Sequence, residues 1–145
     1  MKIVIDADCI VAGTIAASGA AARLLDLWRA GHFELIACRQ LVEEVRQALL
    51  RPRIAKRYGI SSDEIDDLCR RIQEESIWFP DPVDPPRTVA RDANDDYLVA
   101  LAMEGKVDAL VTRDRHFDVV SMPGLRILFP GMLVTELAEA HAAEP

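Results

Sequence analysis

Short apolar runs alternate with longer amphipathic stretches along the chain. The runs fall at residues 3–5, 33–37, 77–79, 109–112 and 126–129. Their shortness and their β-branched residues are typical of strands that are buried on both faces of a sheet. Between the runs, apolar side chains recur at helical spacing, so the sequence predicts strands and helices in alternation.

Capping residues mark where the predicted helices begin and end. Ser18 is the expected N-cap of the first helix, which Gly31 ends. Ser61 and Glu64 have the spacing of a capping box, in which each residue satisfies a backbone or side-chain group of the other. The expected helices begin at Ser18, Arg39, Ser61, Asp95 and Leu133.

Strands that alternate with helices predict a parallel sheet, because parallel neighbours need a crossover connection. Neither half of the chain carries enough apolar sequence for a core of its own, and the proline-rich stretch 80–86 is interpreted as a loop. We therefore predict an α/β fold, a single domain over residues 1–145, with a mostly parallel sheet flanked by helices.

The charge balance narrows the possible partners. The chain has 17 Lys+Arg against 24 Asp+Glu, a net charge of −7, which argues against indiscriminate binding to polyanions. Asp6 and Asp8 interrupt an N-terminal stretch that otherwise mimics a signal peptide, and no apolar run approaches the ~20 residues of a membrane helix. The sequence predicts a cytoplasmic protein that does not enter a membrane. Its three cysteines lack metal-ligand or disulfide spacing and are expected to be buried thiols: Cys9, Cys38 and Cys69.

Four acidic residues stand where a parallel-sheet enzyme would place metal ligands. Asp6 and Asp114 each follow a predicted strand, Asp95 opens a predicted helix, and Glu44 lies about one turn into another. The carboxyl ends of parallel strands share one edge, where ligands bind, so the four side chains are expected to meet there. Clustered carboxylates repel one another strongly unless divalent cations lie among them.

Four segments also carry a family resemblance: residues 3–8, 41–52, 92–102 and 109–117. In order and spacing they resemble the PIN-domain ribonucleases, a group that includes VapC-type toxins of toxin–antitoxin systems. The resemblance implies a PIN-like fold and a Mg²⁺- or Mn²⁺-dependent endoribonuclease. It implies that Asp6, Asp95 and Asp114 bind the metal, and that Glu44 completes the catalytic quartet directly or through water.

The same resemblance implies further residues and partners. Asp8, Asp96 and Thr112 match supporting positions, whereas Arg113 stands where this branch of the family commonly has glycine. A water would attack phosphorus in line and leave 5′-phosphate and 3′-hydroxyl products. The implied partners are an RNA substrate, a cognate antitoxin protein and a second copy of the chain in a homodimer.

Four arginines are candidates for contacts with RNA phosphates. Arg51 and Arg53 belong to the densest positive cluster in the sequence, although a solvated turn is the plainer interpretation of that cluster. Arg113 and Arg115 flank Asp114. We expect all four to influence affinity and salt sensitivity more than sequence choice.

Two other functions fit parts of the pattern. Asp6 and Asp8 after a strand also resemble the nucleophile motif of haloacid-dehalogenase-type phosphatases, in which the first aspartate is phosphorylated. That function requires a lysine at the phosphoryl group, for which Lys106 is the candidate, and it leaves Glu44 unexplained. The third possibility is a PIN-like binding module that retains the fold without catalysis.

Overall fold

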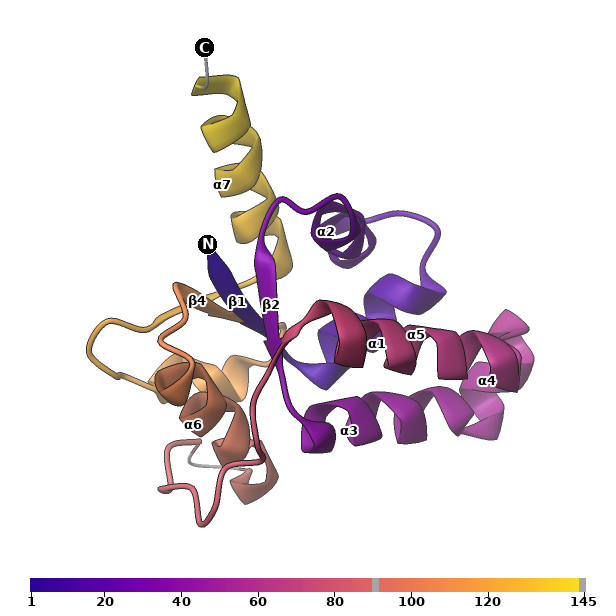
Figure 1. Ribbon diagram of the computed structural model, residues 1–145, viewed down its shortest axis with the longest axis horizontal. Coiled ribbons are helices and arrows are strands. Elements are labelled where there is room, and N and C mark those ends of the chain that lie inside the picture. The colour runs from indigo at the N-terminus through magenta and orange to yellow at the C-terminus, as the bar shows by residue number, and fades with distance from the viewer. Residues whose placement is uncertain (90–91, 144–145) are drawn as a thin grey trace.

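The computed structural model describes residues 1–89 and 92–143 (Figure 1). Within these residues, five strands form one sheet in the order β3-β2-β1-β4-β5, and every neighbouring pair is parallel. The strands are β1 Lys2–Ile5, β2 Glu34–Ala37, β3 Ile77–Trp78, β4 Ala109–Val111 and β5 Arg126–Leu128. The predicted α/β fold with a mainly parallel sheet is confirmed.

Helices cover the sheet and connect its strands. Figure 1 shows α6 on one side of the strands and α1, α3 and α5 on the other, with α3 and α5 side by side. The helix α7 extends away from the sheet and packs against α2 near its start. The helices are α1 Ala7–Ile15, α2 Ala20–Arg29, α3 Arg39–Leu50, α4 Pro52–Tyr58, α5 Ser62–Glu75, α6 Asp96–Glu104 and α7 Pro130–Ala143.

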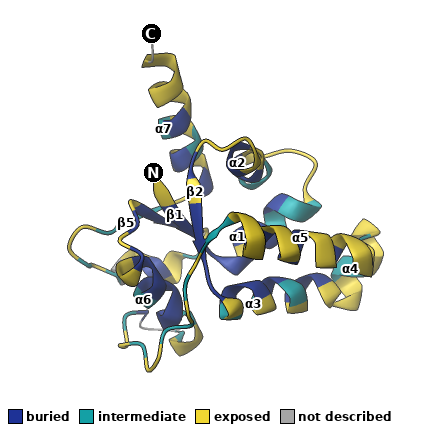
Figure 2. Ribbon diagram, viewed as in Figure 1, coloured by how far each residue is buried: buried dark blue, intermediate teal, exposed yellow. Residues whose placement is uncertain are grey.

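The central strands are continuous apolar runs in the sequence because their residues are buried on both faces of the sheet. The central strands lie between helical layers, and Ile3, Val4, Leu110 and Val111 have no exposed surface (Figure 2). Figure 2 also shows that the distal half of α7 is largely exposed. Strand positions that face helices on both sides must be apolar on both faces, as the sequence pattern indicated.

The helix α1 was not predicted, although it begins immediately after β1. Asp6 is its N-cap, and the Asp6 carboxylate accepts a hydrogen bond from the Cys9 amide at 2.8 Å. The helix packs between α2 and α3, so its surface lacks the polar face that helical periodicity detects. Gly13 permits this packing, because a Cβ there would lie 2.6 Å from the Ala21 carbonyl oxygen.

Two helix starts differ from the prediction because of proline and glycine. The N-cap of α2 is Gly19, at φ 106°, and not Ser18. Pro52 and Pro130 are the first residues of α4 and α7, so each proline begins a helix. Proline suits this position because the first helical amide has no partner within the helix. The segment after Arg51 is therefore helical where a turn was expected.

Three other expectations have direct outcomes. Ser61 caps α5 as predicted: its hydroxyl accepts from the Glu64 amide at 3.1 Å and donates to the Glu64 carboxylate at 3.2 Å. The cysteines are buried free thiols. Among the described residues, no single helix has the length and apolar composition to cross a membrane, and only α1 and α2 together, bent by 94°, pass that test.

Candidate functional site

The strand order changes direction between β1 and β4. From β1 the chain adds strands toward β3, whereas β4 adds β5 on the opposite side. Asp6 directly follows β1, and Asp114 follows β4 after two intervening residues. Such a switch point, at the carboxyl ends of the strands, is where open α/β sheets bind ligands.

Thr112 links the two strand ends. Its side chain is buried, and its hydroxyl donates to Asp6 Oδ2 at 2.5 Å while accepting from the Asp114 amide at 3.0 Å. The other Asp6 oxygen accepts from the Cys9 amide. The orientation of the Asp6 carboxylate is therefore fixed on both sides, and one hydroxyl connects Asp6 with the backbone of Asp114.

Asp114 begins a short 3₁₀ helix, Arg115–Val119, and is partly exposed. Its Oδ1 accepts from the His116 amide at 2.8 Å, and the His116 ring nitrogen Nδ1 lies 3.4 Å from the same oxygen. This turn holds the Asp114 side chain at the edge of the sheet. His116 thus contacts a predicted metal ligand, in agreement with its place in the sequence.

Glu44 is half-buried and turns toward α6. Its Oε2 accepts a hydrogen bond from the Tyr97 hydroxyl at 2.7 Å, whereas the neighbouring Glu43 is exposed. Tyr97 was not singled out from the sequence, because it lies among apolar residues of a core helix. A buried phenol needs a polar partner, and that requirement was the available signal.

Asp95 experiences the electric field of the other predicted acids. Burial, followed by the charges of Asp92, Glu44, Asp114 and Asp6, raises its pKa to about 7. Burial is also the largest cause that raises the pKa of Asp6 and of Glu44. The four predicted acids are therefore within electrostatic range of one another, and Asp92 joins them as an acid to which the sequence analysis gave no role.

A cavity of about 420 Å³ opens among α1, α3 and the start of α6. The acids in its wall are Asp8, Glu43, Glu44 and Asp95, and the cations are Arg39 and Arg51. Asp8 is exposed in the first turn of α1, and its charge helps to raise the pKa of Glu44. The predicted supporting residue Asp8 thus lines the same cavity as Glu44 and Asp95.

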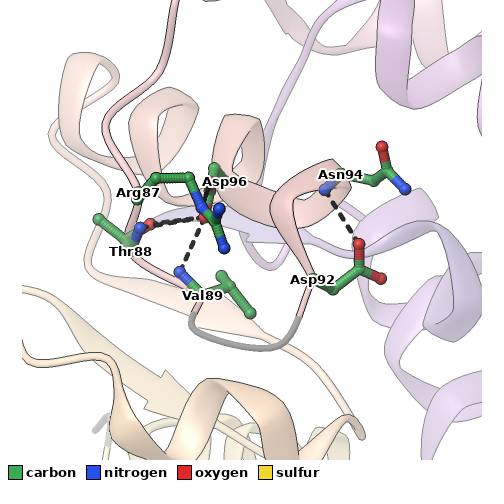
Figure 3. Close-up of polar contacts among 6 residues, drawn as sticks. All are labelled: Arg87, Thr88, Val89, Asp92, Asn94 and Asp96. Carbon is green, nitrogen blue, oxygen red and sulfur yellow. Dashed lines mark hydrogen bonds and ion pairs between the residues drawn. The ribbon is translucent and has the colours of Figure 1, made fainter.

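Asp96 is buried against residues 87–89, unlike the neighbouring Asp95, which lines the cavity. The Asp96 carboxylate accepts from the Val89 and Thr88 amides at 2.8 and 3.0 Å and pairs with the Arg87 guanidinium at 2.9 Å (Figure 3). Burial opposes its ionisation, but these hydrogen bonds and Arg87 outweigh burial and lower the pKa of Asp96. Asp96 therefore anchors the segment 87–89 to the start of α6, and its role as a supporting residue of the site stays a prediction.

The donor set suits a hard divalent cation. Mg²⁺ and Mn²⁺ prefer carboxylate oxygens, and a cation would offset the repulsion that raises the pKa of Asp95. Across residues 1–89 and 92–143, no three His, Cys, Asp or Glu side chains are positioned as a ready-made metal cage. The residues thus fit the cation by the chemistry of their oxygen donors, and two of them, Asp6 and Asp114, lie at the switch point.

Comparison with known proteins identifies the family. The family described as PIN domain matches residues 2–116. The chain belongs to the PIN-domain family. The solved structure titled "Crystal Structure of FitAcB from Neisseria gonorrhoeae" is similar to this PIN domain with a TM-score of 0.52 and 16% sequence identity, over 89% of this chain and 98% of the other. No curated protein matches this chain.

The candidate RNA-contacting arginines of this PIN domain lie in two places. Arg51 borders the cavity that holds Glu44 and Asp95, whereas Arg53 is exposed on α4 and does not line it. Arg113 and Arg115 line another cavity, at the start of α2 and α7. If these arginines contact RNA, they do so at two separate surfaces, one that includes Arg51 and one that includes Arg113 and Arg115.

The position of Lys106 bears on the phosphatase alternative. Lys106 precedes β4, and the neighbouring Asp108 amide bonds to the Lys2 carbonyl at the start of β1. The strands are parallel, so Lys106 lies at the amino edge of the sheet, whereas Asp6 lies at the carboxyl edge. Lys106 is therefore too far from Asp6 to contact a phosphoryl group there, as an aspartyl-phosphate mechanism at Asp6 would require.

Replacing Thr112 tests its link between the two acids of the PIN domain. In the wild type, the hydrogen bond from Thr112 stabilises the ionised Asp6 carboxylate and lowers its pKa. Thr112→Val removes this bond and should therefore raise the pKa of Asp6. It should also lower the free energy of unfolding by about 1–3 kcal/mol, the cost of an unsatisfied buried acceptor. Urea unfolding and an NMR titration of the Asp6 carboxyl carbon would measure both effects. Thr112→Ser is the control, and an equal pKa shift in that variant would contradict the assigned hydrogen bond.

The raised pKa of Asp95 predicts a pH-dependent stability. The unfolded carboxyl releases its proton near 3.8 and the folded one near 7. The folded state therefore binds a proton more tightly, and its stability falls as pH rises from about 4 to about 7. In EDTA at pH 8, Asp95→Asn should stabilise the protein by on the order of 1–3 kcal/mol after solvent screening, with almost no gain at pH 4. A gain of equal size at both pH values would assign the effect to something other than ionisation.

Proposed function

We propose that this PIN-domain protein is a Mg²⁺- or Mn²⁺-dependent endoribonuclease that hydrolyses RNA phosphodiester bonds. One observation carries the proposal: Asp6 and Asp114 lie at neighbouring strand ends, linked through Thr112, and the pKa of Asp95 responds to both of them and to Glu44. Surface acids that serve only solubility need neither this convergence nor a buried hydroxyl that orients one of them.

Each acid has a separate role in the proposed chemistry. Asp6, Asp95 and Asp114 would hold the cation, and Glu44 would complete its shell directly or through water. A bound Mg²⁺ or Mn²⁺ would polarise the phosphodiester, activate a water and stabilise the leaving oxyanion.

Other side chains set the orientation and protonation of these acids. Thr112 donates a hydrogen bond that orients Asp6, and the Tyr97 hydroxyl donates one that orients Glu44 Oε2. The pKa of Asp95 is raised to about 7, so cation binding there would displace the proton from the protonated fraction.

The substrate and products follow from the family resemblance and the charges around the site. In-line attack by water would leave 5′-phosphate and 3′-hydroxyl ends. Arg51 lines the cavity that holds Glu44 and Asp95, and it could neutralise a phosphate of the bound strand despite the net charge of −7. A single-stranded RNA is the proposed substrate because a strand can follow this groove one phosphate at a time.

The biological setting that we propose is a toxin–antitoxin pair in the cytoplasm. The proposal rests on the resemblance of four segments to VapC-type toxins and on membership in the PIN-domain family. A cognate antitoxin would bind the nuclease, and the nuclease would form a homodimer. Induced expression of this protein tests this setting: growth arrest is expected, and it should be relieved by co-expression of an antitoxin if a small reading frame beside the gene encodes one. The absence of arrest contradicts the toxin role.

Cleavage of RNA by the purified protein tests the proposed activity. A fluorescently labelled single-stranded RNA should be cut with Mn²⁺ or Mg²⁺ and remain intact in EDTA. The new ends should carry 5′-phosphate, which a 5′-phosphate-dependent exonuclease detects. Equal cleavage in EDTA would exclude the metal-dependent mechanism, and a phosphoaspartate at Asp6 would support the phosphatase instead.

Arg51 and Arg53 provide a matched test of the RNA path. Arg51→Ala should weaken RNA binding similarly across sequences and reduce the salt slope by about 0.7, the value for one phosphate contact on a single strand. Arg53→Ala removes the same charge away from the cavity and should have a smaller effect. Anisotropy titrations at several salt concentrations measure both slopes. If neither variant, nor the two combined, changes the slope, the strand follows another path.

A further inference from the structure

A second cavity of about 420 Å³ opens at the starts of α2 and α7, beyond Asp114. Arg113 and Arg115, the two neighbours of Asp114 in sequence, contribute to its wall together with Phe129 and Pro130. Its volume lies in the range of roughly 300–1,000 Å³ that is usual for small-molecule sites. The combination of two cations and an aromatic ring in one concave surface suits a ligand with both a phosphate and a flat ring.

Phe129 connects this cavity with the acids. The same residue lines a smaller cavity of about 190 Å³, whose wall includes Thr112 and Asp114. Phe129 is 41% exposed, and it immediately precedes α7, in which Pro130 and Leu133 are buried and Met132 is exposed. An aromatic side chain between the acidic residues and the arginine-lined cavity is therefore accessible to a ligand that extends from one to the other.

The guanidinium groups of Arg113 and Arg115 are accessible to a ligand in this cavity. Within the described part of the chain, Arg113 and Arg115 form no ion pair with a carboxylate, whereas Arg39 pairs with Asp81 and Arg126 with Glu136. Both Arg113 and Arg115 are exposed. Both guanidinium groups are therefore available to an anionic ligand that enters this cavity.

We propose that this cavity binds one nucleotide of a single-stranded RNA, next to the phosphodiester at the acids. This subsite deepens the proposed nuclease function and rests on it. The base stacks on Phe129, and the phosphate of that nucleotide contacts Arg113 and Arg115. The positive end of the α7 dipole lies on the same wall and favours the same anion. Stacking tolerates any base, so the subsite sets affinity and register more than sequence preference.

A nucleotide fits these observations better than a protein partner does. A protein partner that covered Phe129 would have to remove water from both arginines or bring acidic residues to pair with them. Acidic residues on such a partner would be repelled by this chain, whose net charge is −7. Each nucleotide of a nucleic acid carries one phosphate, which can contact the arginines, and one aromatic base, which can stack on Phe129.

Binding measurements can locate the stacked base. The probe is a labelled single-stranded RNA of about 8–10 nucleotides, titrated by anisotropy with Ca²⁺ in place of Mg²⁺ and checked on a gel for intactness. A set of RNAs with one abasic site each is compared on the wild type and on Phe129→Leu, which keeps an apolar side chain without the ring. Phe129→Tyr restores the ring, and Trp78→Leu removes an exposed aromatic from the opposite edge strand as the matched control.

We expect Phe129→Leu to weaken binding by about 10-fold and Phe129→Tyr to restore it. At one RNA position, the abasic site should weaken binding to the wild type by a similar factor and leave binding to Phe129→Leu unchanged. Arg115→Gln should weaken every RNA and flatten the salt dependence. Trp78→Leu should bind RNA like the wild type.

The outcomes separate this subsite from the nuclease activity. Cleavage without coupling between Phe129 and any abasic position overturns the subsite and leaves the nuclease function in place. Coupling without cleavage in any divalent metal supports the subsite and overturns the nuclease function. No RNA binding overturns both. If Phe129→Leu instead releases only a bound protein partner, the cavity is a protein interface and the nucleotide subsite is wrong.

Discussion

Asp6→Asn and Asp114→Asn should each reduce Mn²⁺-dependent RNA cleavage by about 100-fold or more, because each replaces an anionic metal ligand with a neutral amide. The folded structure should persist in both. Asparagine caps helices about as well as aspartate, so the amides of Cys9 and His116 keep an acceptor. Initial cleavage rates at saturating RNA measure the effect, and circular dichroism verifies the fold.

An acid of the same type outside the site controls for the lost charge. Asp63→Asn removes one exposed carboxylate from the first turn of α5 and should leave the cleavage rate unchanged. Wild-type rates in both Asp6→Asn and Asp114→Asn would eliminate the metal-nuclease mechanism. Loss of folding in Asp6→Asn alone would leave Asp114→Asn as the decisive variant, since Asp114 is partly exposed.

Mg²⁺ or Mn²⁺ should stabilise the folded protein by about 2.7 kcal/mol at a metal concentration 100 times the dissociation constant. The native site binds the cation and the unfolded chain lacks the site, so the melting temperature should rise by roughly 5–10 °C for a domain of this size. Thermal unfolding with increasing Mn²⁺ after EDTA treatment measures this shift.

The same titration on variants tests which carboxylates bind the cation. Asp6→Asn and Asp95→Asn should each show a smaller shift, whereas Asp63→Asn should match the wild type. A wild-type melting temperature that does not respond to either metal would count against the whole site, whatever the result of the cleavage assays.

Strand ends were predictable from the sequence because they depend on short-range pattern and on one topological rule. The apolar runs before Asp6 and Asp114 located two strands, and parallel pairing then placed both acids at one edge. Glu44 was distinguishable from Glu43 by its relation to the apolar face of α3. In the structure Glu44 accepts a hydrogen bond from Tyr97 and Glu43 is exposed, while both line the cavity among α1, α3 and α6, so the choice of Glu44 stays a prediction.

Consecutive acids were harder to separate. Asp95 and Asp96 have the same chemistry, but successive helical residues point about 100° apart, so one faces the acids and the other faces Arg87 to Val89. Only the path of the preceding loop decides which is which. Asp92 was missed for the same reason, because its effect on Asp95 depends on a turn that has no periodic pattern.

The helix α1 shows another limit. A helix that is covered on several sides needs no polar face, so hydrophobic periodicity cannot mark it. Proline added a related ambiguity, because a proline that ends one helix can also begin the next, as Pro52 does between α3 and α4. Both features are settled by packing between segments and not by any local run of residues.

The central place of β1 has a consequence for the order of synthesis. This strand is synthesised before the other four strands of the sheet. Its partner β4 follows more than a hundred residues later, and the contact between Thr112 and Asp6 spans 106 positions. Until then one edge of β1 stays unpaired, which is a hazard for aggregation in a nascent chain. The acids of the proposed nuclease site would consequently come together only after β4 has been synthesised, so a ribosome-bound fragment ending before β4 should be unable to cut RNA.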